Sequence, residues 1–301
     1  MRTATKLTAY GAALVLVTAG AWATGTAVGP LGSAVADPGT AAHGDAHSGT
    51  VAEATGLPPG LSTTEQGLTL RPAATTHTGG PFAFTITGPD GAPVTAFDVE
   101  HEKRMHLVVV RRDGSAFRHV HPEMAPDGTW TVPLERPAGG SYRAFADFVP
   151  TGGEPVTLGV DVSVPGEFVP VEHAPGRTAQ VGGYTVTLDG DLVAGQASPV
   201  TLTVARDGVP VTDLEPYLGA YGHLVALRGG DLAYLHVHPE DGPAGPGIGF
   251  VAEVPSAGTY RLFLDFSHGG VVRTAEFTVP TGPSTGAGAE SEPHSHEEGP
   301  R

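Results

Sequence analysis

Six of the 14 histidines in this chain of 301 residues stand in two sets with the same spacing. In each set a single histidine is followed thirteen residues later by a His-x-His pair. The sets are His106, His119 and His121, and His223, His236 and His238. Neutral imidazole is a good ligand for divalent transition metals, and three imidazoles can surround one ion. The sequence therefore predicts two His₃ metal sites.

The residue types also indicate which metal to expect. The chain has no cysteine, which excludes disulfides, Cys-zinc sites, blue copper sites and iron–sulfur clusters. Imidazole without thiolate suits copper(II), zinc or nickel, and copper(II) binds most tightly in the Irving–Williams order. We expect copper(II) as the bound ion, with zinc as the alternative.

Four other side chains could contribute to these sites. Asp147 and Asp265 occupy aligned positions inside apolar segments, where each could orient a histidine, serve as a fourth ligand, or make an ordinary salt bridge or turn hydrogen bond. Met105 and Met124 flank the first set and could supply thioether ligands for copper(I) or simply pack. The second set has no methionine at the aligned positions.

The two sets belong to an internal duplication. Residues 106–123, HLVVVRRDGSAFRHVHPE, align without a gap with residues 223–240, HLVALRGGDLAYLHVHPE, and 10 of the 18 positions are identical. Further on, GSYRAFADF at 140–148 aligns with GTYRLFLDF at 258–266. Two copies of one module of about 100 residues therefore fill most of the chain.

Each copy has the pattern of an all-β module. Short runs of Val, Phe, Thr, Leu and Tyr alternate with Gly, Pro and Asp turns and show no sustained helical period. The element Pro-x-x-Gly-x-Tyr, which ends at Tyr142 and at Tyr260, resembles the tyrosine corner of immunoglobulin-like folds. We expect two tandem immunoglobulin-like β-sandwich repeats. The expected strands include 82–87, 107–111, 129–134 and 142–148 in the first, and 201–205, 224–227, 249–254 and 260–266 in the second.

A hairpin in each repeat must bring the histidines together. Asp113-Gly114 is a strong two-residue hairpin signal, and it predicts that Val108 lies opposite His119 and that His106 lies opposite His121. Because side chains alternate along a strand, all three histidines then lie on one face. A three-residue loop would place His106 on the other face.

The same arithmetic applies to the second hairpin, which turns at Gly230-Asp231. It predicts that His223 lies opposite His238, with His236 on the same face. An alternative remains open for both sets. The histidines could be structural groups that were copied with the whole module, in a metal-free interaction module.

The chain ends differ from the repeats. Arg2 and Lys6 precede an uncharged stretch, residues 7–28 could span a bilayer, and Ala34-Val35-Ala36 is a plausible cleavage site, so the start is either a signal peptide or a membrane anchor. The expected organisation is signal or anchor 1–36, low-complexity tether 37–65, repeat 66–166, linker 167–180, repeat 181–280 and disordered His- and Glu-bearing tail 281–301.

Charge and motifs narrow the function further. The net charge of −16 is repelled by phosphate backbones, which argues against nucleic acid as a partner. No nucleophile, acid–base pair or cofactor motif accompanies the histidines, so we expect no enzymatic activity. The expected partners are a metal ion and an extracytoplasmic protein such as a metal transporter. Contact with the membrane is expected only through an uncleaved anchor.

The pattern HLVV…F-x-H-x-H-P-E…G-x-Y-x-x-F-x-D-F resembles an uncharacterised family of secreted or membrane-tethered bacterial proteins associated with heavy-metal, chiefly copper, handling. The resemblance covers both repeats, most specifically residues 105–148 and 222–266. It implies an immunoglobulin-like fold and an extracytoplasmic location, and it implies no activity. Likenesses to copper-zinc superoxide dismutase and to cupins fail, because the spacing of the remaining ligands does not match.

Overall fold

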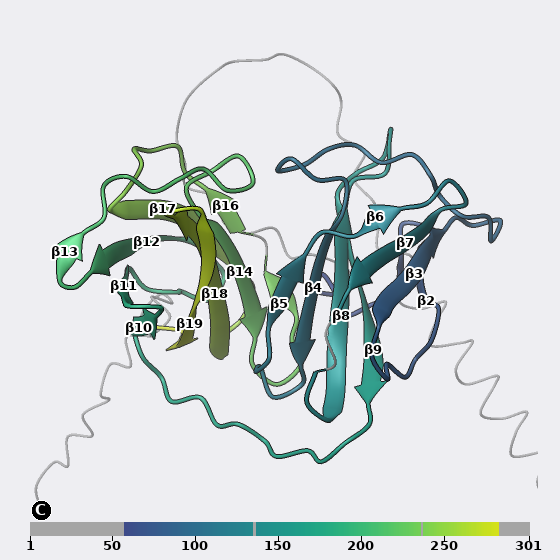
Figure 1. Ribbon diagram of the computed structural model, residues 1–301, viewed down its shortest axis with the longest axis horizontal. Coiled ribbons are helices and arrows are strands. Elements are labelled where there is room, and N and C mark those ends of the chain that lie inside the picture. Colours follow the sequence, from purple (N-terminus) through teal and green to yellow (C-terminus); the bar gives the residue numbers. More distant parts are fainter. Residues whose placement is uncertain (1–56, 135–136, 236, 283–301) are drawn as a thin grey trace, which may run out of the picture. The chain divides into compact units, whose positions relative to one another are not determined.

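The computed structural model describes residues 57–134, 137–235 and 237–282, and every regular element among them is a β-strand (Figure 1). All of these described residues fall in one compact unit. The predicted all-β class is confirmed. Each of the eight predicted strands is present, and most of them extend by one to several residues beyond the predicted limits.

The first repeat is a sandwich of two antiparallel sheets. The strands form where short apolar runs alternate with polar residues, and Gly and Pro turns separate them. One sheet has the order β1 (Thr64–Glu65), β2 (Leu68–Pro72), β3 (Pro81–Thr87), β7 (Thr129–Pro133), β6 (Glu123–Met124). The other has the order β5 (Arg118–Val120), β4 (His106–Arg111), β8 (Gly140–Phe148), β9 (Val156–Val164).

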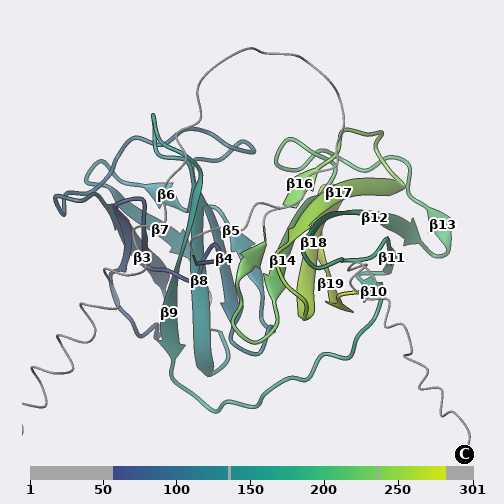
Figure 2. The same ribbon diagram turned by 180° about the vertical axis from the view of Figure 1, so that it is seen from behind.

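The second repeat has the same two-sheet construction, seen from behind in Figure 2. One sheet has the order β10 (Thr178–Val181), β11 (Tyr184–Asp189), β12 (Gln196–Arg206), β17 (Gly247–Val254), β16 (Val237–Pro239), with β13 (Val209–Pro210) paired to β12. The other has the order β15 (Tyr234–Leu235), β14 (His223–Arg228), β18 (Thr259–His268), β19 (Val271–Pro280).

Both predicted tyrosine corners are present. The Tyr142 hydroxyl donates to the carbonyl of Ala138 at 2.9 Å, and the Tyr260 hydroxyl donates to the carbonyl of Ser256 at 2.7 Å. Both rings are buried. Each hydroxyl donates to a backbone carbonyl four residues upstream, which is the contact that defines a tyrosine corner. The paired sheets and these two corners make the repeats immunoglobulin-like.

A third hydrophobic cluster joins the two repeats. Phe117 stacks on Phe263 with ring centroids 3.9 Å apart and planes 5° from parallel, and Phe145 packs on Tyr234 at 5.5 Å. Phe117 aligns in sequence with Tyr234 and Phe145 with Phe263, so the same contact is made twice with the repeats exchanged. All six residues of β4 are buried because its second face packs in this interface.

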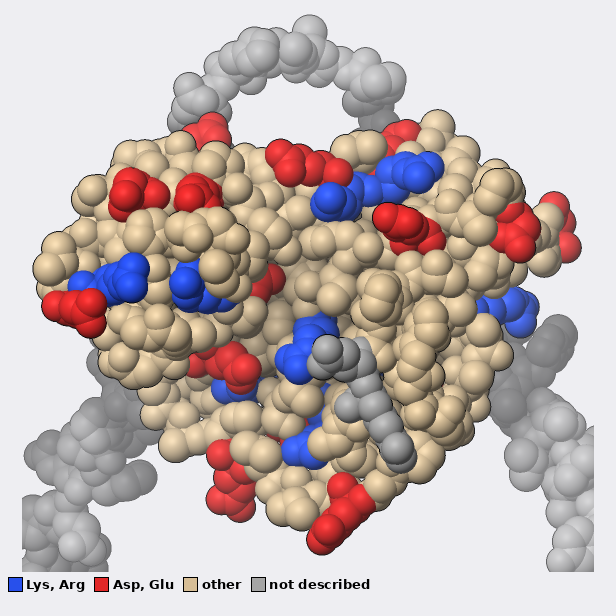
Figure 3. Space-filling view, in the orientation of Figure 1, with Lys and Arg blue, Asp and Glu red and all other residues tan. Residues whose placement is uncertain are grey.

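The chain ends require one correction. The tether expected over 37–65 ends earlier, because the Gly60 amide donates to the Thr157 carbonyl at 2.9 Å and Arg143 donates to the Gly60 carbonyl. The predicted signal or anchor and most of the tail lie outside the described residues. Within the described part of the chain, no helix is long and apolar enough to cross a bilayer. On the face drawn in Figure 3, acidic and basic side chains are scattered in small groups, some of one sign and some mixed.

Candidate metal centre at the junction of the repeats

The β4–β5 hairpin has the predicted register but reaches it by a different turn. The Arg111 amide donates to the Ser115 carbonyl at 2.9 Å, so three residues close the loop. Ala116, with φ of 53°, then acts as an extra, bulged residue. The bulge cancels the longer loop, and Val108 pairs with His119 as predicted. The first set of histidines therefore lies on one face.

His106, His119 and His121 form a compact cluster. Each offers one ring nitrogen, and these nitrogens all lie within 4.8 Å of one another. The ring centroids are 5.4 Å apart for His106 and His119, 5.0 Å for His106 and His121, and 4.9 Å for His119 and His121. His106 is 4% exposed, and His119 and His121 are partly buried.

Hydrogen bonds fix which nitrogens of His106 and His119 carry protons. Nε2 of His106 lies 3.1 Å from the Glu100 carbonyl oxygen, and Nδ1 of His119 lies 2.9 Å from Oδ2 of Asp265. Both oxygens are acceptors, so both nitrogens must donate. In the neutral rings the other nitrogens, Nδ1 of His106 and Nε2 of His119, are then unprotonated, and they face each other at 3.1 Å.

The third ring adds another unpaired nitrogen. Nε2 of His121 is buried and has no hydrogen-bond partner among the described residues. Burial, with a smaller contribution from nearby His119, lowers the pKa of His106 to about 4 and that of His121 to about 3. These two rings are neutral at pH 7. Neutral imidazoles with inward lone pairs are what a cationic ligand requires.

His223 of the second repeat belongs to the same cluster. Its ring lies 5.5 Å from that of His106, with the planes 3° from parallel, and 4.8 Å from that of His119. Burial, followed by the neighbouring histidines, holds its pKa well below the usual range. The structure therefore places His223 against the first set.

The predicted pairing of His223 with His238 is wrong. His238 pairs with Val251, because β15 ends at Leu235 and the chain then crosses to the opposite sheet as β16. His238 is exposed, and His236 lies outside the described residues. A separate site in the second repeat stays a prediction, without the cross-strand contact on which it was based.

The two aspartates hold different positions. Asp265 accepts from His119, in the other repeat, and from the Thr274 hydroxyl at 2.6 Å. Asp147 lies opposite His106 on β8 and accepts from the Thr157 hydroxyl at 2.8 Å. The orienting role considered for these residues thus has a direct geometric basis at Asp265.

Sequence reasoning missed three contributors to the site. Glu100 contributes a backbone carbonyl, which no side-chain pattern can reveal. The His101 ring lies 5.4 Å from that of His223, and the Tyr217 ring lies 6.4 Å from that of His121. Burial and then Asp265 raise the pKa of Tyr217 to about 12. His101 and Tyr217 stand outside the duplicated run, so nothing marked them.

A cavity of about 270 Å³ lies beside the cluster. The histidines that line it come from both repeats: His101, His106, His223 and His238. Met105 is 1% exposed in the core of the first repeat, and Met124 packs against that core. Burial of the two methionines thus supports the interpretation that they pack in the core and do not bind metal. Four histidines line the cavity.

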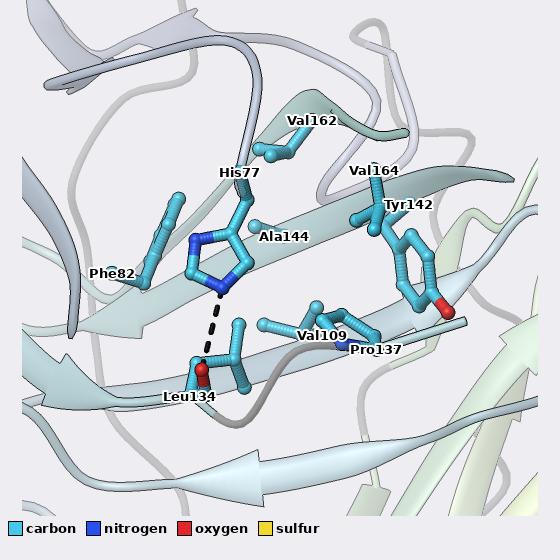
Figure 4. A pocket seen from close by; sticks show the side chains of 9 residues that line it. All are labelled: His77, Phe82, Val109, Leu134, Pro137, Tyr142, Ala144, Val162 and Val164. Atoms are coloured by element: carbon cyan, nitrogen blue, oxygen red, sulfur yellow. Dashed lines mark hydrogen bonds between the residues drawn. The ribbon is translucent and has the colours of Figure 1, made fainter. Parts of the chain in front are cut away.

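His77 shows how a histidine without such neighbours is accommodated here. It is 6% exposed, and its Nε2 lies 3.3 Å from the carbonyl oxygen of Leu134 (Figure 4). Apolar side chains, including Phe82 and Val162, surround the ring around a cavity of only about 10 Å³. This histidine is a core residue with a backbone partner. The cluster at His106 has a different construction, because its nitrogens face one another.

Comparison with solved structures gives only weak global similarity. A chimeric titin Z1Z2 tandem is 12% identical, covers 72% of this chain and 100% of its own, and gives a TM-score of 0.19. The FN1–FN3 domains of chicken CNTN1 are 8% identical to this chain. The match covers 75% of this chain and 67% of the CNTN1 chain, with a TM-score of 0.21. Domains 4 and 5 of the S-layer protein SbsC are 12% identical to this chain. The match covers 73% of this chain and 98% of the SbsC chain, with a TM-score of 0.21.

No curated protein matches the chain. One family does, and it matches twice, over residues 62–166 and 179–282. The two matched segments coincide with the two sandwiches and with the duplicated histidine motifs. The chain therefore belongs to the family described as domain of unknown function DUF8832, of which it carries two copies.

Proposed function

We propose that this protein binds a divalent transition-metal ion at His106, His119 and His121 and serves in extracytoplasmic buffering, storage or delivery of that metal. One observation carries the proposal. Two ring nitrogens that hydrogen bonding leaves unprotonated face each other at 3.1 Å. Two opposed lone pairs at this distance repel each other unless a cation lies between them.

The spacing of the nitrogens suits a metal ion. With metal–nitrogen bonds of about 2.05 Å, a nitrogen separation of 3.1 Å corresponds to an angle of about 100° at the ion, close to tetrahedral. His121 supplies a third buried nitrogen within reach. Three protein ligands leave a fourth position for water or an incoming ligand, which permits exchange of the metal. This arrangement favours buffering or delivery over a permanent structural role.

Copper(II) remains the favoured ion, and zinc the alternative, because the ligands are neutral imidazoles without thiolate. The extracytoplasmic location rests on the N-terminal charge pattern, with Arg2 and Lys6 before the apolar stretch 7–28. The chemistry proposed is binding without catalysis.

A metal-free interaction module is the second candidate, and one observation favours it. His119 and Asp265 form a buried pair, with side chains 1% and 4% exposed. If His119 carried two protons, it could donate both to Asp265 and to Nδ1 of His106, and no metal would be needed between the rings. Nε2 of His121 would still lack a partner among the described residues.

Metal titration distinguishes the two candidates. The full chain should be used with His43, His47, His294 and His296 replaced by Gln, so that the tails do not bind metal. After chelator treatment, Cu(II) and Zn(II) affinities are measured by competition with a chromophoric chelator. We expect saturable binding, and His121→Gln should remove one ion per chain. His121 is a suitable target because its Nε2 has no protein partner to lose.

His268→Gln is the matched control. His268 bonds to Tyr184 and Asp213 in the second repeat, so this variant removes one histidine from outside the cluster. It should leave the affinity and the number of ions unchanged. If the parent binds no ion, or if both variants lose the same amount of metal, the metal-binding proposal is wrong and the metal-free module is favoured.

A further inference from the structure

The histidine cluster of the first repeat is held by a carboxylate of the second. His119 donates from Nδ1 to Oδ2 of Asp265 at 2.9 Å, across the boundary between the repeats. The other oxygen of Asp265 accepts from the Thr274 hydroxyl, which fixes the carboxylate at both ends. Both members of the His119–Asp265 pair are almost fully buried. This contact is therefore a fixed part of the junction.

The contact determines how His119 presents itself. A proton held on Nδ1 leaves Nε2 as the ligand nitrogen, and the carboxylate fixes the plane of the ring. Carboxylates that hold a ligand histidine in this way strengthen metal binding by that histidine. Asp265 is thus a positioning residue for a site whose three histidines all belong to the other repeat.

The surrounding interface makes the placement of Asp265 dependent on how the repeats dock. Phe117 and Phe263 stack on each other, and the Arg261 guanidinium donates to the Gly114 carbonyl at 3.2 Å. His223, opposite Asp265 on the neighbouring strand, lies against His106. Separation of the repeats would remove Asp265 and His223 from the site together.

We infer that the metal site is completed by the second repeat and that metal binding and docking of the two repeats stabilise each other through Asp265. The inference rests on the proposed function. Coupling of this kind is reciprocal, so a docked junction binds metal more tightly and bound metal holds the junction closed. Release of the metal and loosening of the junction would then accompany one another.

The first test replaces the carboxylate without changing its shape. Asp265→Asn keeps an oxygen that can accept from His119 and an amide that can bond to Thr274, so the fold should persist. Loss of the charge should raise the dissociation constant for Zn(II) by about 10- to 100-fold, with an unchanged number of ions. Glu215→Gln, which removes a carboxylate that accepts from the Ser267 hydroxyl within the second repeat, should change this dissociation constant less than about twofold.

The second test measures the junction itself. The chain has no cysteine, so spin labels can be placed at Thr131→Cys on β7 and Thr201→Cys on β12, both exposed positions in different repeats. Pulsed electron–electron double resonance gives the distribution of distances between the two spin labels. Saturating Zn(II) should narrow this distribution in the parent, and it should narrow it less with Asp265→Asn or His121→Gln added.

The outcomes distinguish failure of the coupling from failure of metal binding itself. If the parent binds Zn(II) tightly but Asp265→Asn leaves the affinity unchanged, the coupling is wrong and the proposed function stands. An unchanged label distribution in the zinc-saturated parent also overturns the coupling alone. If the parent binds no metal, the proposed function fails, and the coupling fails with it.

Discussion

Acidification of the metal-free protein should destabilise the fold through His106. Burial, with a contribution from His119, lowers the pKa of His106 from 6.5 to about 4 in the folded protein. Between these two values the unfolded chain binds a proton that the folded chain does not bind. The free energy of unfolding therefore falls as the pH falls from about 6.5 to about 4. The full difference corresponds to about 3 kcal/mol, of which about 2 kcal/mol is lost by pH 5.

Urea denaturation in the presence of a chelator, at pH 7 and at pH 5, measures this effect. His106→Gln is the comparison, because its amide can still donate to the Glu100 carbonyl but does not titrate. The loss of stability between the two pH values should be about 2 kcal/mol smaller in the variant. An equal loss in parent and variant would refute the reasoning, because His106 would then not be held neutral in the folded protein.

Three further predictions concern the interface, the corner and the crossover strand. Phe117→Ala removes the ring stacked on Phe263 and should lower the free energy of unfolding by about 3–4 kcal/mol in urea denaturation; a loss below about 1 kcal/mol would mean that the junction is not packed. Tyr260→Phe removes the bond to Ser256 and should cost about 1 kcal/mol in the same assay, and no measurable cost would contradict the corner. His238→Gln should leave the ion in the first repeat bound at unchanged affinity in chelator competition, since His238 is exposed and is not one of the three clustered histidines, although it lines the neighbouring cavity.

The strands, the repeats and the local hairpin could be predicted from sequence because their determinants are local. Apolar alternation and Gly, Pro and Asp turns define the strands, and Pro-x-x-Gly-x-Tyr defines the corner. The prediction that Val108 lies opposite His119 is confirmed, although the turn contains three residues. It held because Ala116 adds the compensating bulge, a backbone feature without a strong sequence signal.

The composition of the site could not be predicted because it depends on how the two copies dock. A duplication says that each copy has the same parts, and it favours one site in each. The structure instead places His223 against His106 and joins His119 to Asp265, both across the boundary. The sequence pattern could not distinguish Asp147 from Asp265, because the two occupy aligned positions. Only the contact of Asp265 with His119 separates their roles.

The crossover after each hairpin explains the remaining error. Sequence reasoning treated each hairpin arm as one continuous strand through the His-x-His pair. In the structure the arm divides: β5 ends at Val120 and β15 ends at Leu235, and the chain then joins the opposite sheet. His121 remains within reach of His106, while His238 pairs elsewhere. A strand that changes sheets has the same alternation on both sides of the change, so the pattern could not reveal it.

X-ray absorption spectroscopy of the full chain, with the tail histidines replaced and one equivalent of Zn(II) added, tests the central claim most directly. The claim is that the inward nitrogens of His106, His119 and His121 hold a cation. The predicted spectrum has three imidazole nitrogens at about 2.0–2.1 Å, and one imidazole fewer or no bound ion in His121→Gln. A shell of oxygen ligands alone, or the same imidazole count in parent and variant, would contradict the account.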